Sequence, residues 1–412
     1  MPHTGAPACT RPAPPTARWG PPPGPRAASR LQGYAPGVAR PHHVVLVPGF
    51  FGFANLGDFT YFGHVRDLLL EVGPPLGLSG EVEVVRTEPT ASLPRRAALL
   101  CETMSALLDR APGRISLVGH SSGGLDARLL CSPSVTLPTA ADPERCARAV
   151  SALVTVASPH HGTPLAQSFA SLLGQQALRL LSLATIHALR SGQLPLSAVR
   201  QLARVLRLGK APPSGVLEQL TQQLLADFSG ERRRVIETFL ADVRTDQGLV
   251  AQLSPGSMEL FNASTEDRPG LSMACVVTQA RPPSLRSLWA AGLSPYAQAT
   301  HALFVALYRF ASGTPKGWLP RLDRPAVEAL RAVYGRVPPA RANDGIVPTL
   351  SQVRGRVLHA TWADHHDVLG HFHGPTQVPP HFDWVASGSG FDRRRFTALW
   401  QDVAEFLGRP AG

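Results

Sequence analysis

The segment RISLVGHSSGGLDAR constrains this chain more than any other, because a short apolar run leads directly into a glycine-rich turn. Residues 119–123 match the pattern G-x-S-x-G, which marks a sharp strand-to-helix turn with a serine hydroxyl at its tip. Such a turn needs glycines, because side chains at Gly119 and Gly123 would collide with neighbouring backbone. The sequence therefore predicts a strand at 115–118, a helix beyond the glycines and a nucleophilic Ser121 between them. The alternative is a chance match in a chain with 37 glycines.

From residue 43 onward, short apolar runs alternate with segments whose apolar residues recur every three or four positions. The predicted strands lie at 44–47, 82–85, 115–118, 152–156, 273–278 and 356–361. The predicted helices between and after them lie at 62–72, 93–107 and 393–407. Strands and helices that alternate at this spacing predict an α/β domain with a mostly parallel central sheet covered by helices on both faces.

Residues 163–250 interrupt this alternation and instead suggest several short amphipathic helices. No Asp or Glu occurs between residues 145 and 217, whereas basic residues recur at Arg179, Arg190, Arg200, Arg204, Arg207 and Lys210. An apolar face opposite a basic face is typical of a helix that lies on a lipid surface. A helical subdomain packed on the core would show the same pattern. The segment is therefore a predicted helical lid or cap, with the packed subdomain as the alternative.

The first 42 residues differ in composition from the rest of the chain. They are rich in Pro, Ala, Gly and Arg, and such a segment buries too little surface to offset the entropy of ordering, so we expect disorder. Residues 43–412 are expected to form a single catalytic domain. Neither a signal-peptide core nor an apolar run long enough to cross a membrane is visible in the sequence.

The charged residues indicate which partners the chain favours. The net charge is +11, and all but two of the 40 basic residues are Arg, the exceptions being Lys210 and Lys316. This bias is more typical of GC-rich coding than of a nucleic-acid surface, although a basic protein is still attracted to anionic membranes. The five cysteines are too scattered for a zinc motif. Cys131 and Cys146 could pair in an oxidising compartment, but small buried apolar side chains are the favoured interpretation.

A serine nucleophile needs a base, and the base needs an acid that orients it. Asp344 lies in an N-D-G turn, and His365 follows it 21 residues later, directly after a predicted strand. This order, Ser then Asp then His, is the one expected on a parallel sheet with a strand-to-helix nucleophile turn. The alternatives are an ordinary turn aspartate and a surface histidine, and the neighbouring His366 is a direct rival for the role of base.

Stabilising the oxyanion of an ester intermediate requires two backbone N–H groups beside the nucleophile. Ser122, the residue after the nucleophile, is the first expected donor. Phe50 in the stretch LVPGFFGF is the second, because Gly49 before it lets the backbone approach a substrate.

Taken together, six stretches resemble the bacterial triacylglycerol lipases of the Pseudomonas and Burkholderia type. They are VVLVPGFFGFANLGDFTYFGHV, GHSSGGLDAR, VTVASPHHGTPLA, LSPGSMELFN, and NDGIVP followed by ADHHDVLGHF, and they occur in collinear order over most of residues 43–407. The resemblance implies an α/β-hydrolase fold with Ser121 as nucleophile, Asp344 as acid and His365 as base. It also implies Phe50 and Ser122 as oxyanion donors.

The resemblance extends to a structural calcium ion near the base, with Asp367 as one ligand and Asp323 as a loose candidate for a second. No cofactor is expected for the chemistry itself. One departure from the family is Pro48, which stands where those lipases have a histidine that supports the oxyanion loop. The resemblance also favours an exported protein.

These observations lead to the expectation of a serine ester hydrolase that cleaves lipid-like carboxylic esters at an interface. A polyester depolymerase, a thioesterase or an acyltransferase would use the same residues, and a non-catalytic lipid-surface binding protein is the alternative from another class. A lipid or ester substrate and an anionic membrane surface are the expected partners, and no nucleic acid is expected. The pair His160–His161 is expected to be scaffold, and no ligand pattern supports zinc at His371, His373 and His381.

Overall fold

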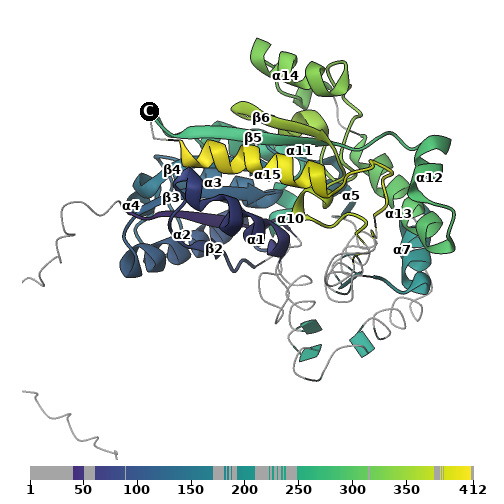
Figure 1. The fold of residues 1–412 in the computed structure, drawn as a ribbon, viewed down its shortest axis with the longest axis horizontal. Helices are drawn as coiled ribbons and strands as arrows, with labels where there is room; N and C mark the ends of the chain where they lie inside the picture. The colour runs from purple at the N-terminus through teal and green to yellow at the C-terminus, as the bar shows by residue number, and fades with distance from the viewer. Residues whose placement is uncertain are drawn as a thin grey trace, which may run out of the picture. The chain divides into compact units, whose positions relative to one another are not determined.

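A six-stranded, all-parallel sheet forms the centre of the domain (Figure 1). The computed structural model describes residues 40–50, 61–88, 90–169, 193–208, 248–313, 316–374 and 385–409, with isolated positions between 181 and 237 and at His381 and Asp383. The predicted disorder of residues 1–42 therefore lies almost wholly outside the described residues. The first strand begins at His42, two residues before its predicted start.

The strand order β2-β1-β3-β4-β5-β6 is that of a doubly wound sheet. The strands are β1 (His42–Val47), β2 (Val82–Val84), β3 (Arg114–His120), β4 (Val150–Val156), β5 (Ser272–Gln279) and β6 (Arg356–Trp362). Each coincides with a predicted strand, because buried parallel strands have near-continuous runs of Val, Ile and Leu. This sheet, with a strand-to-helix turn after β3, confirms the predicted α/β-hydrolase fold.

Helices cover both faces of the sheet. On one face lie α1 (Gly63–Val72) and α15 (Arg393–Gly408), whose side chains form one cluster with Leu46, Val118 and Val154. The helices on the opposite face are α2 (Leu93–Arg110), α3 (Ser122–Cys131), α4 (Pro143–Ala149) and α14 (Arg324–Tyr334). The alternating strand residues supply both clusters, because successive side chains of a strand point to opposite faces.

A third apolar cluster lies beyond the carboxyl end of the sheet and joins segments far apart in the sequence. Here α7 (Leu196–Leu208) packs against α13 (Pro295–Ala311), with Val199, Leu202 and Phe304 completely buried. The side chains of Arg200 and Arg204 point outward, so α7 has the apolar and basic faces that its sequence predicts. Most of the predicted insertion at 163–250 lies outside the described residues.

The long connection between β5 and the N-D-G turn contains three helices that the sequence pattern did not reveal. They are α12 (Leu285–Ala291), α13 and α14. In α13 the run ALFVALYRF is apolar on most sides, and such a run does not distinguish a buried helix from a buried strand. Among the described residues, no helix is both long and apolar enough to cross a membrane.

The cysteines do not form the pair that was considered at 131 and 146. Cys101, Cys131, Cys146 and Cys275 are all free and buried, so the alternative of a Cys131–Cys146 disulfide is wrong. The Sγ atoms of Cys101 and Cys146 lie 3.7 Å apart. These side chains fill the core as small apolar residues.

A buried ion pair links the helical layer to the end of β1. Arg96 of α2 and Asp126 of α3 are fully buried and approach to 2.7 Å. Arg96 also donates to the backbone carbonyl of Pro48 at 2.7 Å and to that of Glu88 at 3.1 Å. Burial raises the pKa of Asp126 to about 6, although the Arg96 guanidinium opposes this shift. Arg96 thus holds the loop after β1.

Replacing Arg96 with Met should lower the free energy of unfolding by about 3–5 kcal/mol, because it leaves the Asp126 carboxylate buried without its partner. Urea unfolding monitored by circular dichroism measures this change. The matched control is Arg95→Met, which removes an exposed ion pair to Glu88 and should cost less than about 1 kcal/mol. Equal losses in the two variants would contradict the importance of the buried pair.

Candidate functional site

Ser121 lies at the carboxyl end of β3, in a backbone conformation that residues other than glycine rarely adopt. Its φ is 54° and its ψ is −130°, and α3 begins at the next residue. The N–H of Ser121 donates to the carbonyl of Val156 at 2.8 Å, which ties the turn to the neighbouring strand β4. A non-glycine residue held at positive φ stores strain and is typical of functional sites. The predicted strand-to-helix turn is therefore present at Ser121.

The glycines around Ser121 allow two loops to approach each other. A Cβ atom on Gly49 would lie 2.6 Å from the Cβ of Ser121, and one on Gly123 would overlap the carbonyl of Val47. Phe50, which follows Gly49, lines the same cavity as Ser121. Ser122 begins α3, and the first N–H groups of a helix have no acceptor within the helix. The two expected oxyanion donors thus belong to segments that meet at Ser121.

Asp344 and His365 lie side by side on loops that follow β5 and β6. The Nδ1 atom of His365 lies 2.8 Å from Oδ2 of Asp344, and the backbone N–H of His365 donates to the Asp344 carbonyl at 3.0 Å. His366 is buried with its ring edge-on to that of His365, and burial lowers its pKa to about 3. Of the two rival histidines, it is therefore His365 whose ring lies within hydrogen-bond distance of Asp344.

The Asp344 carboxylate is held by four further donors. Its Oδ1 accepts from the backbone N–H groups of Ile346 at 3.0 Å and Val347 at 2.7 Å. Its Oδ2 accepts from Thr278 Oγ1 at 2.8 Å and Gln352 Nε2 at 3.2 Å. These bonds fix the carboxylate and therefore also the orientation of the His365 ring. Sequence reasoning missed Thr278 and Gln352, because neither residue belongs to a recognisable motif.

A buried chain of hydrogen bonds runs beneath the site from Tyr61, just before α1, to His365. The Tyr61 hydroxyl and His120 Nδ1 are 2.7 Å apart, and His120 Nε2 lies 3.0 Å from the carbonyl of His365. A carbonyl only accepts, so His120 carries its proton on Nε2, and Tyr61 donates to Nδ1. Burial raises the pKa of Tyr61 and lowers that of His120 well below its usual range, so both groups stay neutral. This chain positions the loop that carries His365.

Ser121 and His365 open on one small apolar cavity of about 40 Å³. Its walls include Leu165, Ala166 and Phe169 of α5 (Pro164–Phe169), and Val250 of α10 (Gly248–Gln252). These helices lie at the two ends of the predicted insertion. A space of this size holds one or a few water molecules and has no room for a long acyl chain.

The predicted scaffold role of the S-P-H-H-G segment agrees with the contacts of its first histidine. His160 is fully buried, with Nε2 3.0 Å from Thr155 Oγ1 and Nδ1 3.3 Å from the Arg128 guanidinium. Burial and the nearby arginine hold the pKa of His160 well below its usual range. Its contacts join β4 to α3 beneath the candidate site.

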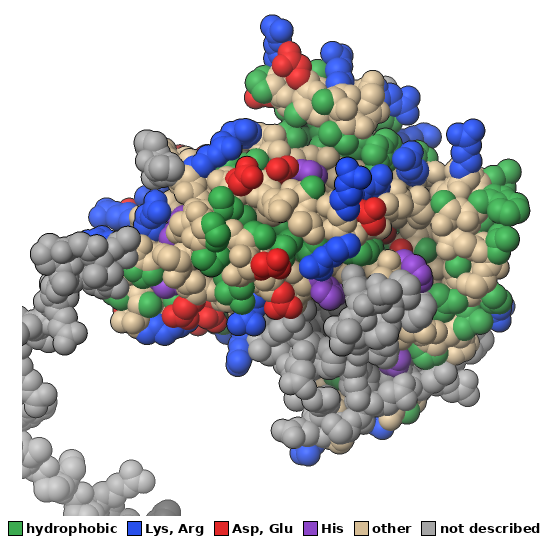
Figure 2. Space-filling view, viewed as in Figure 1, with side chains coloured by type: hydrophobic (Ala, Val, Ile, Leu, Met, Phe, Trp, Pro, Cys, Tyr) green, Lys and Arg blue, Asp and Glu red, His purple; other side chains and the backbone are tan. Residues whose placement is uncertain are grey.

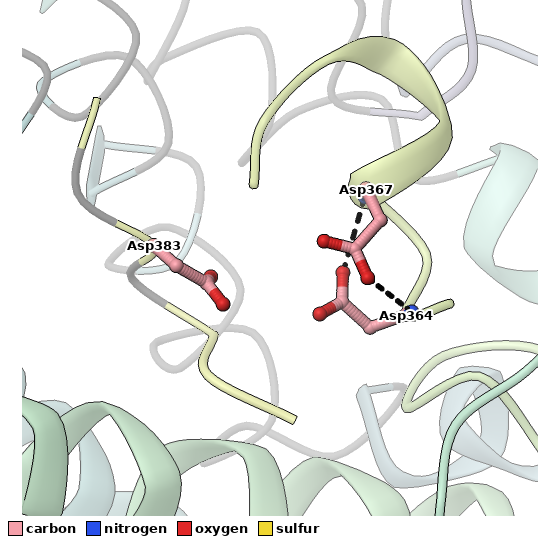
Figure 3. A group of neighbouring side chains, drawn as sticks. All are labelled: Asp364, Asp367 and Asp383. Carbon is pink, nitrogen blue, oxygen red and sulfur yellow. Dashed lines mark hydrogen bonds between the residues drawn. The ribbon is translucent and has the colours of Figure 1, made fainter. Parts of the chain in front are cut away.

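Three carboxylates next to His365 form the one group in the described part of the chain that is compact enough to hold a metal ion. Asp364, Asp367 and Asp383 each place an oxygen within 4.8 Å of the others (Figure 3). Asp364 and Asp367 accept each other's backbone N–H, and Asp383 points toward them from a separate segment. The described salt bridges include none of the three. A set of oxygen ligands suits a hard cation such as Ca²⁺.

Burial and mutual repulsion disfavour three charged carboxylates at this distance. Burial raises the pKa of Asp364 to about 6, and burial together with the neighbouring carboxylates raises those of Asp367 and Asp383 well above their usual range. The predicted ligand Asp367 is thus part of the cluster. The second predicted ligand is wrong, because Asp323 instead caps α14 by accepting from the N–H of Ala326 at 2.8 Å. Asp364 and Asp383 were not anticipated.

The comparisons with known proteins concern structure rather than sequence. No protein-family model matches the sequence, and no curated protein matches it. Among solved structures, a metagenomic carboxyl esterase is 17% identical, with 91% of this chain and 79% of that chain covered and a TM-score of 0.47. Lipase 1 from Pelosinus fermentans is 18% identical, with 89% and 99% covered and a TM-score of 0.47. Staphylococcus hyicus lipase is 14% identical, with 90% and 95% covered and a TM-score of 0.49.

A Tyr61→Phe variant tests the hydrogen-bond chain. Losing the hydroxyl leaves His120 Nδ1 without its donor, so the His365 loop should shift and the reaction of Ser121 with a fluorophosphonate should slow by about tenfold. The control is Tyr334→Phe, which removes another buried hydroxyl that donates to Val277 and Thr361 on the far face. Both variants should lose similar stability, but a similar loss of reactivity would contradict the positioning role.

Proposed function

We propose that this protein is a serine hydrolase of carboxylic esters. The observation that carries the proposal is the strained turn at Ser121, which shares one apolar cavity with the Asp344-oriented His365. A serine becomes nucleophilic when a neighbouring base takes its proton and a third group orients that base. An apolar cavity wall favours acyl groups over sugars or phosphates.

In the proposed reaction, Ser121 Oγ attacks the ester carbonyl as His365 Nε2 takes its proton. The carbonyl oxygen becomes an oxyanion that the N–H groups of Phe50 and Ser122 stabilise. Collapse of the intermediate expels the alcohol, which receives the proton from His365, and leaves an acyl group on Ser121. A water molecule, deprotonated by His365, then attacks the acyl-enzyme and releases the carboxylic acid. Asp344 accepts from His365 Nδ1 and stabilises the imidazolium in both steps.

Lipid-like esters are the substrate class that we propose, in keeping with the resemblance to lipases of the Pseudomonas and Burkholderia type. The cavity is too small for a long acyl chain, and α5 and α10 at the ends of the insertion form part of its wall. We infer that this part of the insertion moves when substrate enters. Polyester depolymerase, thioesterase and acyltransferase activities need the same residues, and no specific contact favours one of them over hydrolysis of a lipid ester.

We also propose that Asp364, Asp367 and Asp383 bind a calcium ion that stabilises the His365 loop. The support is the oxygen-only ligand set and the proximity of three acids next to His365, of which Asp364 and Asp367 are buried and Asp383 is half-buried. The ion takes no part in the acyl transfer. Its role is to compensate the repulsion among the three carboxylates and to tie the segment around Asp383 to the loop around Asp367.

Ser121→Ala should reduce hydrolysis of p-nitrophenyl esters by roughly a thousandfold or more, because the nucleophile is lost. The fold should persist, since deleting one hydroxyl costs little stability. Esterase assays together with thermal unfolding measure both effects. Comparable activity in the variant would exclude the acyl-enzyme mechanism. If the parent protein hydrolyses none of a series of short to long esters, a non-catalytic lipid-binding protein is favoured instead.

Two histidine variants separate the rival bases. His365→Ala should be nearly as inactive as Ser121→Ala, because the members of a triad act as a unit. His366→Ala should keep most of the activity, although it loses a buried side chain and some stability. Steady-state assays below the melting temperature of each variant make the comparison, and an exchange of the two phenotypes would assign the base to His366.

Calcium should raise the midpoint of thermal unfolding of the parent protein, and a chelator should lower it, because a ligand that binds the native state stabilises it. The double variant Asp367→Asn/Asp383→Asn should lose this response. Asp109→Asn, which alters an exposed acid far from the cluster, should keep it. An equal calcium response in the cluster variant and the control would place the ion elsewhere.

A further inference from the structure

One short helix exposes large hydrophobic side chains in a group. Leu285 and Trp289 of α12 are 76% and 66% exposed, and Leu293 just beyond its end is 68% exposed. The described residues include three other large hydrophobic side chains that are exposed, Leu70, Leu260 and Val333, and these are scattered. Single exposed apolar residues are ordinary, whereas a contiguous group marks an interaction site. These three side chains are called the α12 patch below.

The inner side of α12 is anchored, so that the patch faces outward. Ser284 and Ser287 form a reciprocal cap at the start of the helix, and Ser287 is buried. The Ser287 hydroxyl lies 3.4 Å from His301 Nε2 on α13, and a Cβ on Gly388 would lie 2.7 Å from the Ser287 carbonyl. Because Leu285 and Trp289 are four residues apart, they lie on one face of the helix. Figure 2 shows hydrophobic side chains at the right-hand edge, where Figure 1 places α12.

Two exposed arginines lie on or beside α12 in the chain. No Asp or Glu occurs between residues 268 and 322, a stretch that includes all of α12 and α13. Arg281 precedes the helix, Arg286 lies within it, and both are exposed. Tryptophan next to Leu and Arg is typical of helices that insert into the boundary between lipid headgroups and acyl chains. Anionic lipid would satisfy both the apolar and the basic side chains.

The α12 patch is adjacent in the chain to a helix that shares an apolar cluster with residues of the cavity wall. The helix α12 leads directly into α13, and α13 shares one apolar cluster with α7, with Phe169 of α5 and with Phe50. Phe169 and Phe50 also line the cavity at Ser121. A lipid surface that held α12 would therefore lie next to the α7–α13 layer, whose apolar cluster includes two residues of the cavity wall.

We propose that the α12 patch, together with Arg281 and Arg286, is the surface by which this protein docks on anionic lipid. This inference rests on the proposed function, because it names the surface by which an ester hydrolase would bind the lipid that contains its substrate. It assigns docking to α12, outside the basic insertion that the sequence pattern favoured.

The first experiment measures vesicle binding by the full chain carrying Ser121→Ala, so that no lipid is consumed. The variant Leu285→Ser/Trp289→Ser/Leu293→Ser should lower the partition coefficient on vesicles of phosphatidylcholine with phosphatidylglycerol by about tenfold or more. The matched control, Leu70→Ser/Leu260→Ser/Val333→Ser, removes the scattered exposed residues and should bind as the parent does. Equal binding by the two triple variants would overturn the proposal.

A second measurement follows Trp289 itself. The tryptophan emission of the parent should shift to shorter wavelength on vesicles, and Trp289→Phe should lose most of that shift while it stays folded. Arg281→Gln/Arg286→Gln should remove the preference for anionic over neutral vesicles at low salt. An emission shift that persists in Trp289→Phe would overturn lipid docking. A concentration-dependent dimer that the α12 triple variant abolishes would also overturn it, because the patch would then bind a second copy of the chain.

Kinetic assays distinguish failure of lipid docking at α12 from failure of the proposed esterase function. With Ser121 intact, the α12 triple variant should hydrolyse a short soluble ester at the parental rate and an emulsified long-chain ester on anionic lipid about tenfold more slowly. If the parent hydrolyses no ester, the proposed function fails even where vesicle binding is normal. If both variants hydrolyse the emulsion equally, docking at α12 fails while the esterase remains.

Discussion

The close approach of the loop after β1 to the turn at Ser121 is the contact on which the rest of the candidate site depends. Gly49 and Gly123 permit this approach, because a side chain at either position would overlap the opposite segment. The approach brings Phe50 and Ser122 to the same point. Ser121 therefore stands at positive φ in surroundings that determine its conformation from several directions, which is how a fold maintains local strain.

Buried polar groups hold the loops around this contact. Arg96 binds the carbonyl of Pro48 and so supports the loop after β1, whereas Tyr61 and His120 support the backbone of His365. Each of these groups is satisfied by another buried polar group, and such networks define one arrangement because any alternative leaves a donor or acceptor unpaired. The site thus depends on residues of α2, of β3 and of the turn before α1 that do not line the cavity.

The carboxyl end of the sheet combines chemical groups with apolar cover. The cavity at Ser121, the acidic cluster beside His365 and the α7–α13 layer all lie around loops that follow parallel strands. Ligand sites of open α/β sheets generally form at this edge, where several loops converge. The exposed hydrophobic residues of α12 belong to the same long connection between β5 and Asp344. This connection thereby supplies both α13, which packs in one cluster with Phe50 and Phe169, and an outward apolar surface.

The sequence by itself determined the sheet, the turn at Ser121 and the residue types and order of Ser121, Asp344 and His365, because local patterns encode all of them. Buried strands require continuous apolar runs, and the turn requires its glycines. Tertiary structure decided which of His365 and His366 faces Asp344, and it brought Thr278, Gln352 and Tyr61 to the site. It also joined Asp383 to Asp364 and Asp367, and it formed α13 from an apolar run with no clear period. These features depend on contacts between distant segments, and such contacts leave no periodic signal in the chain.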